Sequence, residues 1–131
     1  MAKLRTQEVE RLLHKYPLYS QDGKDAEALV LCKFFIGSAT WYIMEGSEEG
    51  GDFTLFGLTC MGQDAEFGYT SLSELESIAI ETDIMDERTK QSKGTMIFEV
   101  ERDISFEPVT LKELAKIDDL VEGKLRLMGY I

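Results

Sequence analysis

Apolar side chains near the start of the chain follow the spacing of one helical face. They recur at positions i, i+3, i+4 and i+7 and are Val9, Leu12, Leu13 and Tyr16. Thr6 precedes this pattern and can cap a helix through its side-chain oxygen, whereas Pro17 follows it and cannot continue a helix. The pattern therefore predicts an amphipathic helix that ends before residue 17.

Two later stretches carry a capping box, in which a Ser or Thr is followed three residues later by Glu. Ser71 and Glu74 open "SLSELESIAI", which predicts a short helix. Thr110 and Glu113 open "TLKELAKIDDLVEG", which predicts a longer helix with Gly123 as its C-cap. The apolar tail "KLRLMGYI" is then expected to dock on the core.

Between these helices, runs rich in β-branched and aromatic residues predict strands. The predicted strands are residues 29–36, 40–45, 53–60, 65–70 and 95–104. In the last run Met96, Phe98 and Val100 alternate with Glu99 and Glu101, which indicates a half-buried strand. The first two runs are separated by a short turn and are expected to form a hairpin.

The order of elements is helix, four strands, helix, strand and helix, with a polar stretch at residues 81–94 that is expected to be exposed and mobile. Helices do not alternate with every strand, so a doubly wound parallel sheet is not predicted. We expect an α+β fold: a mainly antiparallel sheet of about five strands, with two to three helices packed on one face. The 131 residues, 44% of them hydrophobic, are enough for one domain over residues 1–131.

Several classes of protein are excluded by composition. The chain has no run of about 18 apolar residues, which a membrane span requires, and its first residues do not form the apolar segment of a secretion signal. Cys32 and Cys60 both lie in apolar runs, which predicts buried free thiols in a reducing cytoplasm. The net charge of −11 argues against direct binding of nucleic acid. We therefore expect a cytoplasmic protein that contacts neither membrane nor nucleic acid.

The negative charge is concentrated in one block, residues 45–87, which holds twelve Asp and Glu residues and no Lys, Arg or His. One interpretation is a solvated surface that aids solubility, and another is a surface that meets a basic partner. The candidate protein-binding residues are Trp41, Glu45, Glu48, Glu49, Asp52, Asp64 and Glu66. The carboxylates are expected near successive turns at one end of the sheet. Trp41 is either a core residue or an interface anchor.

Signals for catalysis are weak. His14 is the only histidine, and its place at the end of the first predicted helix is typical of a structural residue. No phosphate loop, dinucleotide fingerprint or zinc-ligand spacing occurs in the chain. Glu45, Glu48, Glu49 and Asp52 could surround a hard cation, but the calcium-loop pattern is absent. No catalytic residue, metal ligand or cofactor is predicted.

Five motifs in a fixed order resemble a bacterial family that is known only as a numbered domain of unknown function. They are "VLCKFF", "WYIMEG", "GDFTLFGL", "EFGYTSLSELESI" and "VERDISFEPVTLKEL", and the resemblance covers about residues 12–115. Members of that family are small proteins typical of plasmids, phages and integrative conjugative elements. The resemblance implies a mobile-element setting, but it implies no activity, cofactor or catalytic residue.

These observations predict a non-catalytic domain that binds a basic or nucleic-acid-binding protein through its acidic surface. A narrower form of the hypothesis is a nucleic-acid mimic that inhibits a DNA-binding protein, because carboxylates along one edge can imitate the charge of a duplex. The alternative is a carboxylate-based or metal-dependent hydrolase. A mimic requires carboxylates spread over a convex face, whereas an enzyme requires carboxylates that converge in a pocket.

Overall fold

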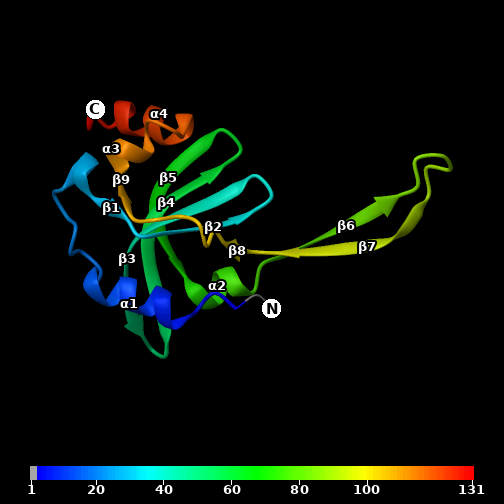
Figure 1. Ribbon diagram of the computed structural model, residues 1–131, viewed down its shortest axis with the longest axis horizontal. Coiled ribbons are helices and arrows are strands. Elements are labelled where there is room, and N and C mark those ends of the chain that lie inside the picture. Colours follow the sequence, from blue (N-terminus) through cyan, green and yellow to red (C-terminus); the bar gives the residue numbers. More distant parts are fainter. Residues whose placement is uncertain (1–2) are drawn as a thin grey trace.

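The computed structural model describes residues 3–131 and consists of a central antiparallel sheet with helices around it (Figure 1). The strands of this sheet lie in the spatial order β5–β4–β3–β2–β8. Their bounds are β2 (Cys32–Ile36), β3 (Ala39–Glu49), β4 (Asp52–Met61), β5 (Asp64–Ser71) and β8 (Glu101–Arg102). Every neighbouring pair is antiparallel, which confirms the predicted α+β class and the predicted five-stranded sheet.

Two smaller sheets and four α-helices complete the described chain. β1 (Leu29–Val30) pairs with β9 (Val109–Thr110), and β6 (Ala79–Met85) pairs with β7 (Ser92–Glu99). The helices are α1 (Gln7–Lys15), α2 (Leu72–Glu76), α3 (Leu111–Leu114) and α4 (Asp119–Leu127), with a short 3-10 helix η1 (Asp25–Glu27). The predicted N-caps Thr6, Ser71 and Thr110 each accept the expected backbone hydrogen bond. None of the helices in residues 3–131 is long and apolar enough to cross a bilayer.

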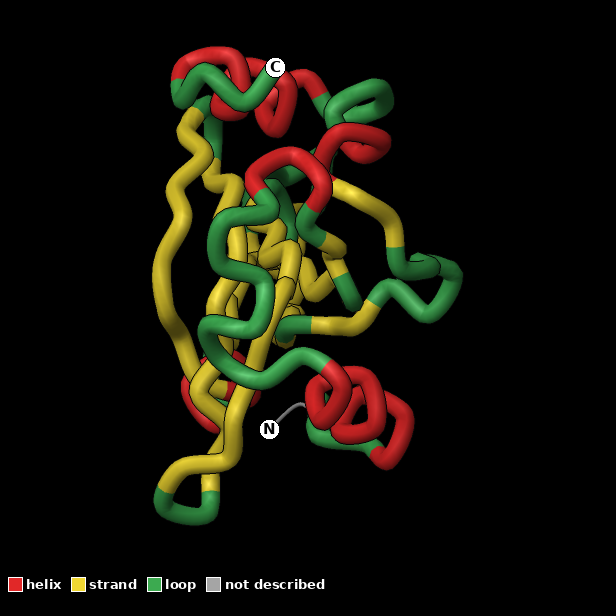
Figure 2. Tube along the Cα trace, turned by 90° about the vertical axis from the view of Figure 1, so that its left-hand side faces the viewer, coloured by secondary structure: helices red, strands yellow, loops and turns green. Residues whose placement is uncertain are grey.

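The helices cover both faces of the sheet, so the prediction that they pack on one face is wrong. Trp41 and Ile43 of β3 belong to a core cluster that includes residues of α1 and α2. Tyr42 and Met44 belong to a second cluster, which includes residues of α3 and α4. Successive residues of a strand point to opposite faces, and all of these residues are apolar. Both faces of β3 therefore require a covering layer. Figures 1 and 2 show α1 and α4 far apart, at opposite ends of the sheet.

A β-bulge in β3 depends on a glycine in the neighbouring strand. The register shifts between Ile43 and Glu45, so that Met44 has no partner of its own in β4. Next to the bulge, a Cβ atom on Gly57 would lie 2.0 Å from the Tyr42 carbonyl oxygen. Only glycine permits this approach. Because of the bulge, Met44 and Glu45 both line the same cavity and do not point to opposite faces.

The region after α2 differs most from expectation. The polar stretch 81–94, predicted to be exposed and mobile, is exposed but forms much of a paired hairpin, β6–β7, which projects from the main sheet (Figure 1). We call residues 79–99 the ribbon. The predicted helix over residues 71–80 ends at Glu76, and the predicted strand 95–104 is divided into β7 and β8 around the buried Val100.

The predicted C-terminal helix is two helices. The side chain of Asp118 accepts hydrogen bonds from the backbone N–H groups of Leu120 and Val121, and so caps α4 as a new helix. Gly123 lies inside α4 and is not its C-cap, and Gly129, with φ of 77°, follows the helix instead. The tail does dock, because Leu125 is fully buried in the second core cluster.

The first prediction concerns the glycine at the bulge. Gly57→Ala should lower the free energy of unfolding by about 3 kcal/mol or more, because the new methyl group overlaps the Tyr42 carbonyl. Gly68 lies directly opposite Gly57 in β5 and has open space at its Cβ position, so Gly68→Ala should change stability by no more than about 0.5 kcal/mol. Urea denaturation of both variants measures the difference. Equal effects would show that the close contact does not constrain the sheet.

Candidate functional site

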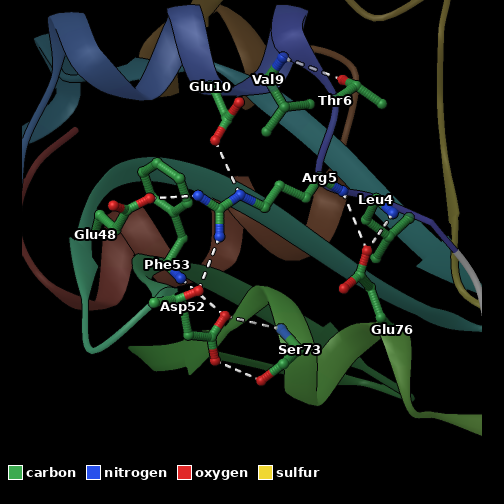
Figure 3. A network of polar contacts seen from close by, with 11 residues as sticks. Leu4, Arg5, Thr6, Val9, Glu10, Glu48, Asp52, Phe53, Ser73 and Glu76 are labelled. Carbon is green, nitrogen blue, oxygen red and sulfur yellow. Dashed lines mark hydrogen bonds and ion pairs between the residues drawn. The ribbon is translucent and has the colours of Figure 1, made fainter.

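The acidic turn between β3 and β4 is occupied by an arginine from the N-terminal segment (Figure 3). Arg5 donates from Nε to Glu10 Oε1 at 2.9 Å and from Nη1 to the Gly51 carbonyl at 2.9 Å. Its Nη2 donates to Glu48 Oε2. The guanidinium carbon lies 4.8 Å from the centre of the Phe53 ring, which adds a cation–π contact. Glu48 is therefore paired within the chain.

The same end of the sheet holds α2 through a second carboxylate. Asp52 accepts hydrogen bonds from the backbone N–H and the hydroxyl group of Ser73, and the hydroxyl bond is the main cause that lowers the pKa of Asp52. In α2, Glu76 accepts from the backbone N–H groups of Leu4 and Arg5, at 2.7 and 3.2 Å. The N-terminal segment, the acidic turn and α2 are thus joined by one polar network, which Figure 3 shows.

Glu45, a predicted partner-binding residue, is in the interior. Its side chain is 3% exposed, and its two oxygens accept hydrogen bonds from the backbone N–H groups of Tyr19 and Gln21, both at 2.8 Å. The Gln21 side chain in turn donates to the carbonyl groups of Leu29 and Met44. Glu45 holds the loop after α1 against the sheet and cannot contact a partner, so this part of the prediction is wrong. Glu45 is buried because the bulge in β3 turns its side chain toward that loop.

The remaining candidates are not gathered at one end of the sheet. Asp64 and Glu66 follow the turn between β4 and β5, whereas Glu48, Glu49 and Asp52 lie at the turn before β4. A strand as long as β4 separates its two ends by about 30 Å. Glu66 also has an ion-pair partner, Lys124 of α4, at 3.3 Å. The expectation of one acidic end is therefore wrong.

Trp41 is a core residue. Its exposed fraction is 7%, and it packs in the first core cluster. Of the two interpretations of this side chain, the structure supports core packing. Trp41 is not available as an interface anchor on the described surface.

The titratable groups in the core do not form a nucleophilic set. Burial raises the pKa of Cys32 to about 12 and that of Cys60 to about 11, so both thiols are protonated near neutral pH. The two cysteines belong to different core clusters and are free. His14 is exposed on α1. Within residues 3–131, no group of three or more His, Cys, Asp and Glu side chains is placed to hold a metal ion.

A cavity of about 190 Å³ lies beside Glu45, with Phe56, Phe67 and Tyr130 in its wall. Its buried polar side chains are Gln21 and Glu45, and both already hydrogen-bond to the backbone. These two side chains hold the loop after α1 in place.

The surface that sequence reasoning missed is the ribbon. The cross-strand pairs Ile80–Phe98, Thr82–Met96 and Ile84–Gly94 share one face, because residues directly opposite one another in an antiparallel pair lie on the same side. The four large side chains of this apolar face are 39–47% exposed. A signal for it was present, since Glu81 and Asp83 alternate with the β-branched residues Ile80, Thr82 and Ile84. The signal was missed because most residues of the stretch 81–94 are polar, which favoured an exposed segment without regular structure.

A family model described as "Protein of unknown function (DUF2958)" matches residues 4–122. No curated protein and no solved structure matches the chain.

The second prediction tests the Asp52 contact through its pH dependence. Asp52→Asn should lower the free energy of unfolding by about 1 kcal/mol at pH 7, because the hydrogen bonds from Ser73 lose a charged acceptor. The pKa of Asp52 is lowered in the folded state, so its contribution is complete above the unfolded pKa near 4 and is lost as the pH falls further. The difference between wild type and variant should therefore shrink between about pH 5 and about pH 2.

Asp64→Asn, at the other end of β4, is the matched control. It should show no such pH-dependent difference, because no hydrogen bond to its carboxylate is found in residues 3–131. Urea denaturation across the pH range gives both comparisons. A difference for Asp52→Asn that is as large at pH 2 as at pH 7 would contradict the assignment.

The third prediction compares two glutamates of the same turn region. Glu45→Gln should cost about 2 kcal/mol of stability, because an amide NH₂ group would face a backbone N–H donor in the interior. Glu49→Gln, on the exposed turn, should change stability by no more than about 0.5 kcal/mol. Thermal unfolding of the two variants distinguishes them. A neutral Glu45→Gln substitution would show that this buried contact is not required.

Proposed function

The chain belongs to the DUF2958 family of proteins of unknown function, and from its surface we propose that it is a non-catalytic domain that binds another protein through the β6–β7 ribbon. The observation that carries the proposal is the apolar face of that ribbon. Ile80, Ile84, Met96 and Phe98 lie together on it and remain 39–47% exposed. Exposed apolar patches of this kind mark interaction sites in soluble proteins.

The low stability of an isolated two-stranded hairpin supports the same proposal. Two strands alone are marginal in water, and a third strand or a packed layer is normally required. The ribbon projects from the main sheet, so its apolar face does not belong to either core cluster (Figure 1). A partner protein that covers this face would supply the missing layer.

We propose a basic or nucleic-acid-binding protein as the partner. The net charge of −11 favours encounter with a positive surface, and Glu81 and Asp83 add carboxylates to the ribbon itself. The two free thiols suit the reducing cytoplasm, where such a partner would be met. A mobile-element setting, which the family resemblance implies, is compatible with an inhibitor or regulator of a host protein.

The narrower hypothesis, a nucleic-acid mimic, has to rest on the ribbon. The acidic turn cannot supply a row of charges together with Glu66, because the two lie at opposite ends of β4 and Glu48 is paired with Arg5. The ribbon carries Glu81 and Asp83, and its turn carries Asp86 and Glu87. Nothing in the described residues favours the alternative, a hydrolase.

The fourth prediction tests the ribbon as the contact surface. Wild-type protein is used to capture binding proteins from bacterial lysate at about 50 mM and about 500 mM salt, and captured proteins are identified by mass spectrometry. Ile80→Ser with Phe98→Ser should abolish capture, because it removes a cross-strand apolar pair. Ile117→Ser removes a still more exposed isoleucine, which lies between α3 and α4, and should leave capture intact.

Two further comparisons make this test decisive. Circular dichroism should show the same fold for all variants, because these side chains lie outside the core clusters. Glu48→Lys with Glu49→Lys should leave capture intact if the ribbon is the contact surface. Loss of capture with that variant, but not with the Ile80 and Phe98 variant, would move the binding site to the acidic turn.

A further inference from the structure

We infer that the partner holds the ribbon inside a cleft that has one apolar wall and one basic wall. This inference rests on the proposed function, and it adds the chemistry of the surface that the partner must present. It follows from three properties of the ribbon, namely the different chemistry of its two faces, the area of each face and the pairing state of its carboxylates.

The two faces of the ribbon differ in chemistry. The apolar face consists of the pairs from Ile80–Phe98 to Ile84–Gly94. The opposite face consists of the pairs Ala79–Glu99, Glu81–Ile97 and Asp83–Thr95. Ile97, at 66%, is the most exposed large apolar side chain of the two strands, and it lies between carboxylates. A binding surface of one kind therefore cannot complement both faces.

One face is too small for a stable complex. The four large side chains of the apolar face, each about 200 Å² when fully exposed, are 39–47% exposed and offer on the order of 350 Å². Covering both faces and both edges of a ribbon about 24 Å long, about 10 Å wide and about 10 Å thick buries on the order of 900 Å². A typical specific interface buries about 800 Å² on each partner. Only a partner that surrounds the ribbon reaches that area without help from the main sheet.

Glu81 and Asp83, two carboxylates of the second face, remain available for a basic wall. Among residues 3–131, neither Glu81 nor Asp83 has an ion-pair or hydrogen-bond partner. Asp86, one of the two acidic residues at the turn, is different, because it accepts hydrogen bonds from the backbone of Arg88 and Thr89 and lies 3.8 Å from Lys93 Nζ. Glu81 and Asp83 thus place charge on this face, where Lys or Arg residues of a partner would meet it.

A second copy of the chain does not meet these requirements. Two ribbons packed through their apolar faces would bury only on the order of 350 Å² on each chain, well below the area of a stable dimer. The acidic faces would remain uncovered, and pairing acidic face with acidic face would bring Glu81 and Asp83 close to their own copies. The occupant is therefore a different protein with a cleft.

The test places the photo-crosslinker p-benzoylphenylalanine on either face of the ribbon in the full chain expressed in bacterial cells. Thr82 lies on the apolar face and Thr95 on the acidic face, and both are exposed. Ile117, exposed on the main body, is the control position. We expect Thr82 and Thr95 to give adducts with the same second protein and Ile117 to give none. Peptides linked to Thr95 should be rich in Lys and Arg, and those linked to Thr82 should be apolar.

A charge reversal provides the matched variant. Glu81→Lys with Asp83→Lys should reduce both adducts at least tenfold, whereas Glu49→Lys with Asp64→Lys changes the net charge equally and should not reduce them. Far-ultraviolet circular dichroism identifies any variant that fails to fold. Because the reversed residues are exposed, folding should be retained.

The outcomes separate the inference from the proposed function. Adducts at Thr82 alone would overturn the two-walled cleft while retaining a protein partner at the apolar face. Adducts of twice the mass of this chain would assign the ribbon to a homodimer and would overturn the cleft. Absence of adducts at both faces would overturn the cleft and the proposed function together.

Discussion

The fold depends on the close approach of two backbones at Gly57, where a side chain would overlap the Tyr42 carbonyl. That approach accommodates the bulge at Met44, and the bulge changes which side of β3 the following residues face. Glu45 then meets the loop after α1 and accepts two of its backbone N–H groups. The same strand buries Trp41 and Ile43 on one face and Tyr42 and Met44 on the other. A single glycine thus positions the strand at the centre of both cores.

The acidic block shows how little a count of charges says about a surface. Of the carboxylates expected to meet a partner, Glu45 is buried, Glu48 binds Arg5, Asp52 binds Ser73 and Glu66 binds Lys124. Carboxylates are good acceptors for backbone N–H groups, hydroxyl groups and guanidinium ions, so a fold with many of them uses several internally. The network in Figure 3 attaches the N-terminal segment and α2 to one turn. The role of this turn is therefore structural, because it connects the N-terminal segment and α2 to the sheet.

The ribbon has the opposite character, because its four large apolar side chains on one face lie outside both core clusters and remain 39–47% exposed. Ile80, Ile84, Met96 and Phe98 lie on one face, whereas Glu81 and Asp83 lie on the other together with Ile97, and the main sheet supports the ribbon only at its base (Figure 1). An arm of this kind gains stability when another protein covers it. We therefore propose partner binding as the role of the ribbon, with different contact chemistry on its two faces.

Local patterns in the sequence determined the helix starts at Thr6, Ser71 and Thr110, the antiparallel sheet and the resemblance to the family, because caps and alternation act over a few residues. The tertiary structure alone decided which faces the helices cover, where the carboxylates lie and that residues 79–85 pair with residues 92–99. Each of these depends on contacts between residues far apart in the chain or on the register of a strand. A one-residue bulge such as that at Met44 reverses the side on which a carboxylate lies, and no local spacing records it.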